Sequence, residues 1–149
     1  MKGLAEGGSS DFGTEGGCLC GAVRFRVTSA PLAVSRCHCR SCRRAVGSAG
    51  VTWTIFRRED FLLLRGQPAR YRSSEQATRT FCGVCGTSLS YEPAAATGQI
   101  ELTTASFDEP GQFSPTREVW LDHRVAWEPM DPSLVHFSRG STGKGADDA

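Results

Sequence analysis

The chain has 149 residues, of which 39% are hydrophobic and 22% are charged, and its formal net charge is +1. A chain of this length buries enough apolar surface to form one globular domain. So small a net charge excludes the chain-wide positive field by which many proteins bind nucleic acids or anionic membranes. Any binding role of its arginines must therefore be local.

Both ends of the chain are rich in glycine, serine and charged residues. We expect disordered tails at 1–15 and 138–149 around a single domain at 16–137. The N-terminal stretch lacks the apolar core of a secretory signal, and no later stretch approaches the ~20 apolar residues of a membrane span. The sequence therefore predicts a cytoplasmic protein without a membrane partner. In a reducing cytosol its seven cysteines favour metal binding over disulfides.

Alternation of apolar and polar residues, or a high content of β-branched and aromatic residues, predicts strands in seven segments. In chain order they are 21–28, 50–56, 61–66, 69–74, 78–82, 87–93 and 98–107. The best helical candidate is one or two turns within CRSCRRAVG, which Ser41 could cap and Gly47 could end. Four prolines in 110–132 indicate an irregular flap with a strand around REVWL. The sequence thus predicts a mainly β fold with very little helix.

The seven cysteines form three groups by spacing, which are Cys18-x-Cys20, Cys37-x-Cys39-x-x-Cys42 and Cys82-x-x-Cys85. Two short chelating arms from distant parts of a chain can close a structural zinc site with four thiolates. The natural set is Cys18, Cys20, Cys82 and Cys85. In the turn CGVCG, Gly86 can adopt a positive φ, which would let backbone amides point at the sulfurs. A redox role for this C-x-x-C pair is the less favoured interpretation.

The middle group, Cys37, Cys39 and Cys42, supplies three thiolates within six residues. Three ligands leave one position of a tetrahedral ion open, as in a catalytic zinc site. If all seven cysteines competed for one metal, three would remain as oxidation-prone thiols. We therefore expect two zinc ions, and the incomplete ligand set of the second is compatible with partial occupancy.

Four arginines flank this middle group, namely Arg36, Arg40, Arg43 and Arg44. Their charges would lower the pKa values of the thiols and balance a site of three thiolates and one zinc ion. We name Arg40, Arg43 and Arg44 as candidate substrate-binding residues, because guanidinium groups can pair with a carboxylate through two hydrogen bonds. The alternative is a solvated turn in which they only compensate charge.

Three histidines are weaker candidates for the site. His38 lies between two predicted ligands, so its side chain is expected to point away from the metal that they share. An ordinary surface hydrogen bond is the favoured interpretation for His123 and His136. Five aromatic residues could exclude water from the site, although each is also a normal core residue: Trp53, Phe81, Tyr91, Trp120 and Trp127.

Three motifs in this order, GGCLCGAVRF, CHCRSCRRAVG and FCGVCGTSLSYE, resemble the glutathione-dependent formaldehyde-activating family, also described as the centromere protein V and formaldehyde-activating domain. The resemblance covers about residues 16–130 and all seven cysteines. It implies antiparallel sheets that lean together like a tent around the metals. It also implies a structural zinc on Cys18, Cys20, Cys82 and Cys85 and an active-site zinc on Cys37, Cys39 and Cys42. One departure is Glu118, in REVW, where many members have a histidine.

The resemblance implies condensation of glutathione with formaldehyde to S-(hydroxymethyl)glutathione, which is the reverse of a carbon–sulfur lyase reaction. Our leading hypothesis is a zinc-dependent enzyme of this type, in which the open zinc site receives the sulfur of a small thiol. One alternative is a non-enzymatic zinc-binding interaction module, although the small net charge argues against nucleic acid as its partner. Another is a thiol redox or metal-transfer protein. Exposed β edges make a homodimer plausible.

Overall fold

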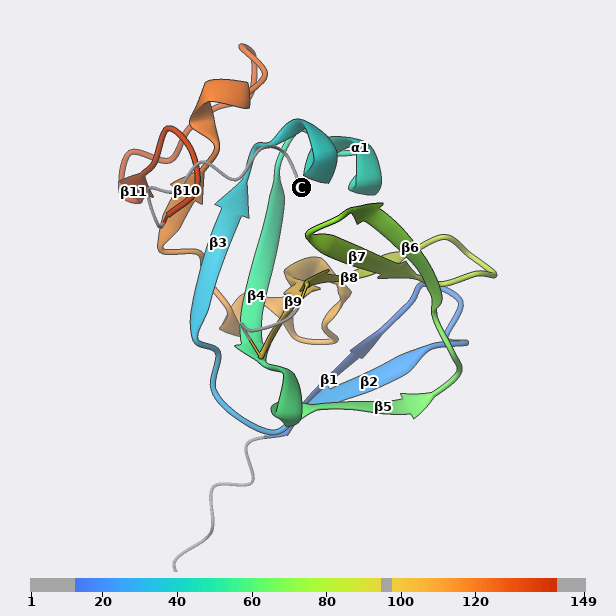
Figure 1. Ribbon diagram of the computed structural model, residues 1–149. Helices are drawn as coiled ribbons and strands as arrows, with labels where there is room; N and C mark the ends of the chain where they lie inside the picture. Colours follow the sequence, from blue (N-terminus) through green and yellow to red (C-terminus); the bar gives the residue numbers. More distant parts are fainter. Residues whose placement is uncertain (1–12, 95–97, 142–149) are drawn as a thin grey trace, which may run out of the picture.

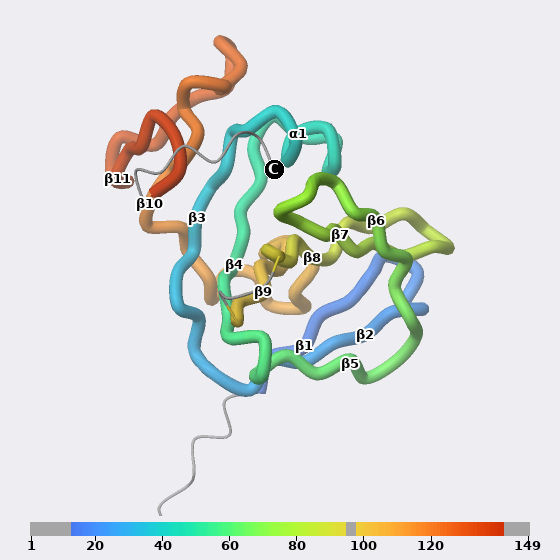
Figure 2. Tube along the Cα trace, viewed as in Figure 1, coloured from blue at the N-terminus to red at the C-terminus, as the bar shows by residue number. Residues whose placement is uncertain are grey.

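The computed structural model describes residues 13–94 and 98–141, and the strands of this part of the chain form two β-sheets (Figures 1 and 2). The smaller sheet is antiparallel and has the order β1-β2-β5, with bounds Thr14–Gly17, Arg24–Val27 and Phe61–Arg65. The larger sheet has the order β11-β10-β3-β4-β9-β8-β7-β6. Its strands are β3 (Ala33–Cys37), β4 (Val51–Arg57), β6 (Ala69–Ser74), β7 (Ala77–Phe81), β8 (Ser88–Pro93), β9 (Gln99–Thr103), β10 (Arg117–Val119) and β11 (Val135–His136).

The predicted β fold is confirmed, and each of the seven predicted segments contains a strand. Most neighbouring strands pair antiparallel, whereas β10 joins β3 in parallel and β11 joins β10 in parallel. In Figure 1, β2 and β5 run across the lower part of the molecule, whereas β3 runs upward and β4 runs back down beside it, so the two sheets lean together. The prediction missed β1, β3 and β11, because these strands are short or lack a regular alternation of apolar and polar residues.

The predicted tails differ from the structure at their inner ends. Thr14 and Glu15 belong to β1, because their backbones pair with Val27 and Arg26 of β2. Residues 138–141 are also described, and the backbone N–H of Asp122 donates to the carbonyl of Ser138 at 3.0 Å. The remainder of both predicted tails, 1–12 and 142–149, lies outside the described residues.

The single α-helix of the described residues, α1 (Arg40–Val46), lies where a short helix is predicted, but its N-cap is Cys39 rather than Ser41. The Cys39 sulfur accepts a hydrogen bond from the backbone N–H of Cys42, which is the capping interaction predicted for a serine oxygen. Gly47 ends the helix with φ 74°, as predicted. Four short 3-10 turns are η1 (Arg58–Asp60), η2 (Thr104–Ser106), η3 (Pro110–Gln112) and η4 (Leu121–His123). Within the described ranges, no helix is both long and apolar enough to cross a bilayer.

The core consists of two clusters on opposite faces of the larger sheet. The first joins the two sheets and includes Phe25, Val27, Phe56, Ile100, Leu102, Phe107 and Phe113. The second lies beside α1 and includes Cys37, Cys39, Cys42, Val51, Trp53 and Val119. Side chains alternate between the faces of a strand, so β4 directs Phe56 into the first cluster and Trp53 into the second. The second face of the sheet therefore carries the middle cysteine group.

Candidate metal centres and active site

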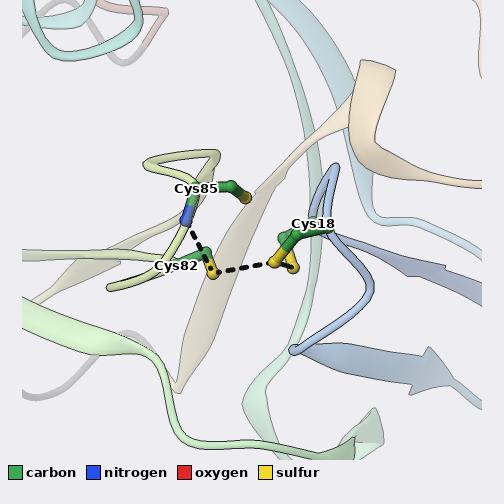
Figure 3. A group of neighbouring side chains, drawn as sticks. Cys18, Cys82 and Cys85 are labelled. Carbon is green, nitrogen blue, oxygen red and sulfur yellow. Dashed lines mark hydrogen bonds between the residues drawn. The ribbon is translucent and has the colours of Figure 1, made fainter.

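Four cysteines from two distant loops converge at one end of the molecule. Cys18 and Cys20 lie between β1 and β2, and Cys82 and Cys85 lie in the turn between β7 and β8. Figure 3 shows that Cys18 faces Cys82 and Cys85 across the gap between the two loops. The four sulfurs lie within 4.8 Å of one another, as the predicted structural set requires. The cluster links the smaller sheet to the larger one.

Backbone amides surround the sulfurs of this cluster. The N–H of Val23 donates to Cys18 Sγ at 3.2 Å, and the N–H groups of Val84 and Cys85 donate to Cys82 Sγ at 3.4 and 3.5 Å. Gly86 has φ 81°, which confirms the predicted turn geometry. The hydroxyl and backbone N–H of Thr87 lower the pKa of Cys85 to about 5. These contacts stabilise thiolates, which are the form of cysteine that binds metal.

The distances between sulfurs fit a tetrahedral zinc ion. Four thiolates at about 2.3 Å from such an ion lie about 3.8 Å from one another. The Sγ atoms of Cys18 and Cys20 are 3.6 Å apart, and those of Cys20 and Cys82 are 3.8 Å apart. All seven cysteines are free thiols, so none is removed from metal binding by a disulfide. The donor set and its spacing therefore fit a four-coordinate zinc ion.

The three cysteines of the middle group form a second cluster in which all three residues are buried. Cys37 ends β3, Cys39 caps α1 and Cys42 lies in its first turn, and their sulfurs lie within 4.8 Å of one another. The thiols of Cys37 and Cys42 hold the pKa of Cys39 well below its ordinary value, because both donate toward its thiolate. This donor set fits zinc with one coordination position left for another ligand.

Arg79 lies directly beside this second cluster, and the sequence analysis did not predict it. The residue is 6% exposed, and its two terminal nitrogens lie 3.7 Å from Cys42 Sγ. Its guanidinium lies over the ring of Tyr91, with 4.9 Å between the Cζ atom and the ring centroid. Side-chain alternation along β7 places Arg79 on the same face as Ala77 and Phe81. A charged residue on an otherwise apolar face was therefore the signal available in the sequence.

Arg79, Tyr91 and Glu101 form a row across β7, β8 and β9, since Arg79 is paired with Tyr91 and Tyr91 with Glu101. Residues directly opposite one another in a sheet share a face. Burial raises the pKa of Glu101 to about 7, although the charges of Arg117 and Arg79 oppose this shift. Trp53 is 2% exposed, and its ring centroid lies 6.3 Å from that of Tyr91. This polar row therefore borders the three-cysteine cluster and is shielded by aromatic rings.

The arginines predicted to bind substrate lie on α1 or directly at its start. Arg40 and Arg44 are exposed, and Arg43 is half-buried with its Nε donating to the carbonyl of His38 at 3.3 Å. Arg36 forms an ion pair with Glu128. The substrate-binding role of Arg40, Arg43 and Arg44 stays a prediction.

The histidines take part in contacts away from the cysteine sulfurs. The Nε2 atom of His38 lies 2.9 Å from Glu118 Oε1, and both side chains are fully buried. His136 Nε2 lies 3.2 Å from the second oxygen of Glu118, and the ring of His123 stacks on Trp120 with centroids 5.1 Å apart. Each of the two metal-ligand clusters found among the described residues consists of cysteines alone. Glu118 is thus a buried partner of two histidines.

A cavity of about 580 Å³ lies beside the four-cysteine cluster and extends to the C-terminal end of α1. Its lining includes Cys18 and Cys85 of the first cluster and Val46 of α1, which packs against the second cluster. The hydroxyl residues Ser88 and Thr103 also line it. A small organic molecule could therefore occupy the space between the four-cysteine cluster and α1.

The fold and the cysteine clusters define a mainly β protein with two cysteine clusters that could each hold a metal ion. The model of the glutathione-dependent formaldehyde-activating enzyme family matches residues 13–123, and the chain belongs to this family. That assignment confirms the resemblance seen in its three motifs.

Two curated relatives share about half of the chain. A Halomonas elongata protein named "Putative glutathione-dependent formaldehyde-activating enzyme" is 38% identical over 85 residues, which cover 50% of this chain and 53% of that protein. A Schizosaccharomyces pombe protein named as an uncharacterized lyase is 32% identical over 75 residues, covering 50% of this chain and 54% of that protein. The chain thus spans about half the length of the curated relatives it matches.

A solved structure supports the fold. The crystal structure of a Rhodobacter sphaeroides protein superposes with a TM-score of 0.55 at 22% identity, covering 83% of this chain and 98% of that chain. At this level of identity, the similarity concerns the fold alone.

Proposed function

We propose that the chain is a zinc-dependent enzyme of the carbon–sulfur lyase type, which joins a small thiol such as glutathione to formaldehyde and also catalyses the reverse reaction. Family membership supports the reaction class, as do the printed names of the two curated relatives. The observation that carries the proposal is a buried cluster of three cysteines, one ligand short of a tetrahedral set. A reactive thiol site of this kind also suits a reducing compartment such as the cytoplasm.

Cys37, Cys39 and Cys42 would hold the catalytic zinc, and Cys18, Cys20, Cys82 and Cys85 the structural one. A zinc ion bound by the three cysteines supplies Lewis-acid chemistry that favours the thiolate form of a substrate thiol. Trp53 and Tyr91 limit the access of water to this region, because Trp53 is buried and Tyr91 is half-buried against the cluster. Limited access of water strengthens electrostatic interactions in the site.

The atoms of the reaction balance without an external oxidant or reductant. The thiolate sulfur forms a bond to the carbonyl carbon of formaldehyde, and the π electrons of the carbonyl move to its oxygen. That oxygen then takes up a proton, equivalent to the one that the thiol released. The product is an S-hydroxymethyl thioether, and cleavage of its carbon–sulfur bond regenerates thiol and aldehyde.

Metal analysis followed by calorimetric titration tests this proposal. We expect the purified protein to bind up to two zinc ions and to bind glutathione, whereas S-methylglutathione, which lacks the free thiol, should not bind. NMR with ¹³C-formaldehyde and glutathione should show faster formation of the hydroxymethyl adduct than in a protein-free control. Binding of both peptides with equal affinity, or an unchanged rate, would refute the thiol chemistry. Formation of a disulfide within the three-cysteine cluster as its only reaction would instead support a redox protein.

A further inference from the structure

Arg79 is a buried cation whose charge is directed at the three-cysteine cluster. Both terminal nitrogens approach Cys42 Sγ at 3.7 Å, and the guanidinium lies over the Tyr91 ring, with its Cζ atom 4.9 Å from the ring centroid. A guanidinium group remains protonated at all physiological pH values, and its burial is costly without a nearby negative charge. The thiolates of the cluster supply such a charge. Arg79 can therefore interact with an anion that binds beside these thiolates.

A count of charges on this face shows that a further anion can be accommodated. Three thiolates and one divalent cation carry a net charge of −1, and Arg79 and Arg117 contribute +2. Arg117 belongs to the same region, because its Nε donates to Ser35 Oγ and its charge acts on Glu101. Glu101 subtracts one charge when ionised and none when protonated. The sum lies between 0 and +1, so an arriving thiolate meets a neutral or positive site.

The arginines of α1 are less suited to this task. Arg44 is exposed to solvent, where an ion pair contributes little to binding. Arg43 directs its Nε to the carbonyl of His38. Arg79 combines burial, two parallel donors and direct contact with a cluster sulfur. Its contact with the cluster therefore distinguishes it from Arg43 and Arg44.

We propose that Arg79 binds the reacting anion of this site, which is the substrate thiolate before the carbon–sulfur bond forms and the alkoxide oxygen after it forms. This inference rests on the proposed function. The thiolate donates the electron pair of the new bond, and the electron pair displaced from the carbonyl π bond becomes the negative charge on oxygen. The N–H groups of Arg79 donate to that oxygen until it is protonated. Arg79 would thus be a catalytic residue rather than an anchor for a distant carboxylate.

The test compares two thiols that differ in their carboxylates. Zinc-loaded protein is titrated with glutathione and with 2-mercaptoethanol, which has no carboxylate, for the wild type, Arg79→Gln and the control Arg72→Gln, which changes an exposed arginine of β6. If Arg79 binds the reacting sulfur, Arg79→Gln weakens the binding of both thiols by a similar factor, at least about tenfold. The Arg72→Gln variant should bind both as the wild type does, because the residue of β6 that pairs with Arg79 is Tyr71, and side-chain alternation places Arg72 on the opposite face. Zinc content is measured for each protein, and the two variants should retain the wild-type amount.

The possible results separate the inference from the proposed function. Weaker binding of glutathione alone in Arg79→Gln would make Arg79 a carboxylate anchor and overturn the inference, as would unchanged binding of both thiols. If the wild type bound neither thiol, the proposed function would fail, and the inference with it. If Arg79→Gln does not fold or bind zinc, Arg79→Lys serves instead, because lysine keeps the positive charge but cannot form the bidentate hydrogen bonds of a guanidinium group. We expect this variant to bind both thiols several-fold more weakly, and unchanged affinity would again overturn the inference.

Discussion

The imidazole of His38 and the carboxylate of Glu118 are joined by a 2.9 Å hydrogen bond between two side chains that have no exposed surface. The second carboxylate oxygen accepts from the backbone N–H of Asp131 at 3.0 Å and lies near His136. Glu118 thus connects β3, β10 and the segment before β11. Because His38 separates Cys37 from Cys39, this connection also fixes the loop that carries the three-cysteine cluster.

We predict that Glu118→Ala lowers the free energy of unfolding by about 2–4 kcal/mol, because it leaves a buried imidazole and a backbone amide without their acceptor. Glu118→Gln should cost less, since its amide oxygen can still accept one of these bonds. Urea denaturation measures both effects. The control is Asp122→Ala, which removes an exposed ion pair with Arg139 and should change stability by less than about 1 kcal/mol. Equal effects of Glu118→Ala and Asp122→Ala would contradict the structural role of Glu118.

The two cysteine clusters should differ in their effect on folding. Cys82 is 1% exposed, packs in the core cluster between the sheets and belongs to the set that links them. Cys82→Ser should therefore lose one zinc and much of the cooperative unfolding transition. Cys42→Ser should lose about one zinc while the remainder of the domain stays folded. Metal analysis and circular dichroism measure these outcomes, and unfolding of the Cys42→Ser protein would make both sites structural.

Glycine substitutions in the CGVCG turn test its backbone geometry. Gly86 has a positive φ of 81°, a region that costs an L-residue about 1 kcal/mol or more. Gly86→Ala should therefore weaken zinc retention and stability. Gly83 in the same turn is a matched control, because a Cβ there would meet only the Ala69 Cβ at 3.8 Å, an ordinary contact. Competition with a chelator should extract zinc from the Gly86→Ala protein first, and equal loss from both variants would contradict the prediction.

Glu101 should make stability depend on pH. Burial raises its pKa from 4.5 to about 7 in the folded protein. Between these values the folded state binds more protons than the unfolded state, so this group makes the free energy of unfolding fall as pH rises. Glu101→Gln removes this contribution, so the variant should gain stability relative to the wild type across the window. The gain would be at most about 1.4 kcal/mol per pH unit. Parallel pH profiles from thermal unfolding would show that Glu101 does not titrate in this way.

Local patterns in the sequence predicted much of the fold. Alternating residues located the β2 region, and glycine located the end of α1 and the turn at Gly86. These signals are local, because side-chain alternation and positive φ depend on a few neighbouring residues. The short strand β3, AVSRC, lacks such a pattern, since it places Val34 and Ser35 in buried positions on opposite faces. Its identity as a strand depends on pairing with β4 and β10.

The cysteine spacing by itself determined the division of seven thiols into four and three, because chelation requires ligands that are close in sequence or carried by turns. Only the tertiary structure decided that Arg79 accompanies the three, since β7 is more than thirty residues from Cys42 and meets it through sheet pairing and the packing of α1. The same holds for Glu118, which reaches His38 across 80 residues of sequence. Ligand spacing is a local property of the chain, whereas the partner of a buried charge is set by the packing of distant strands.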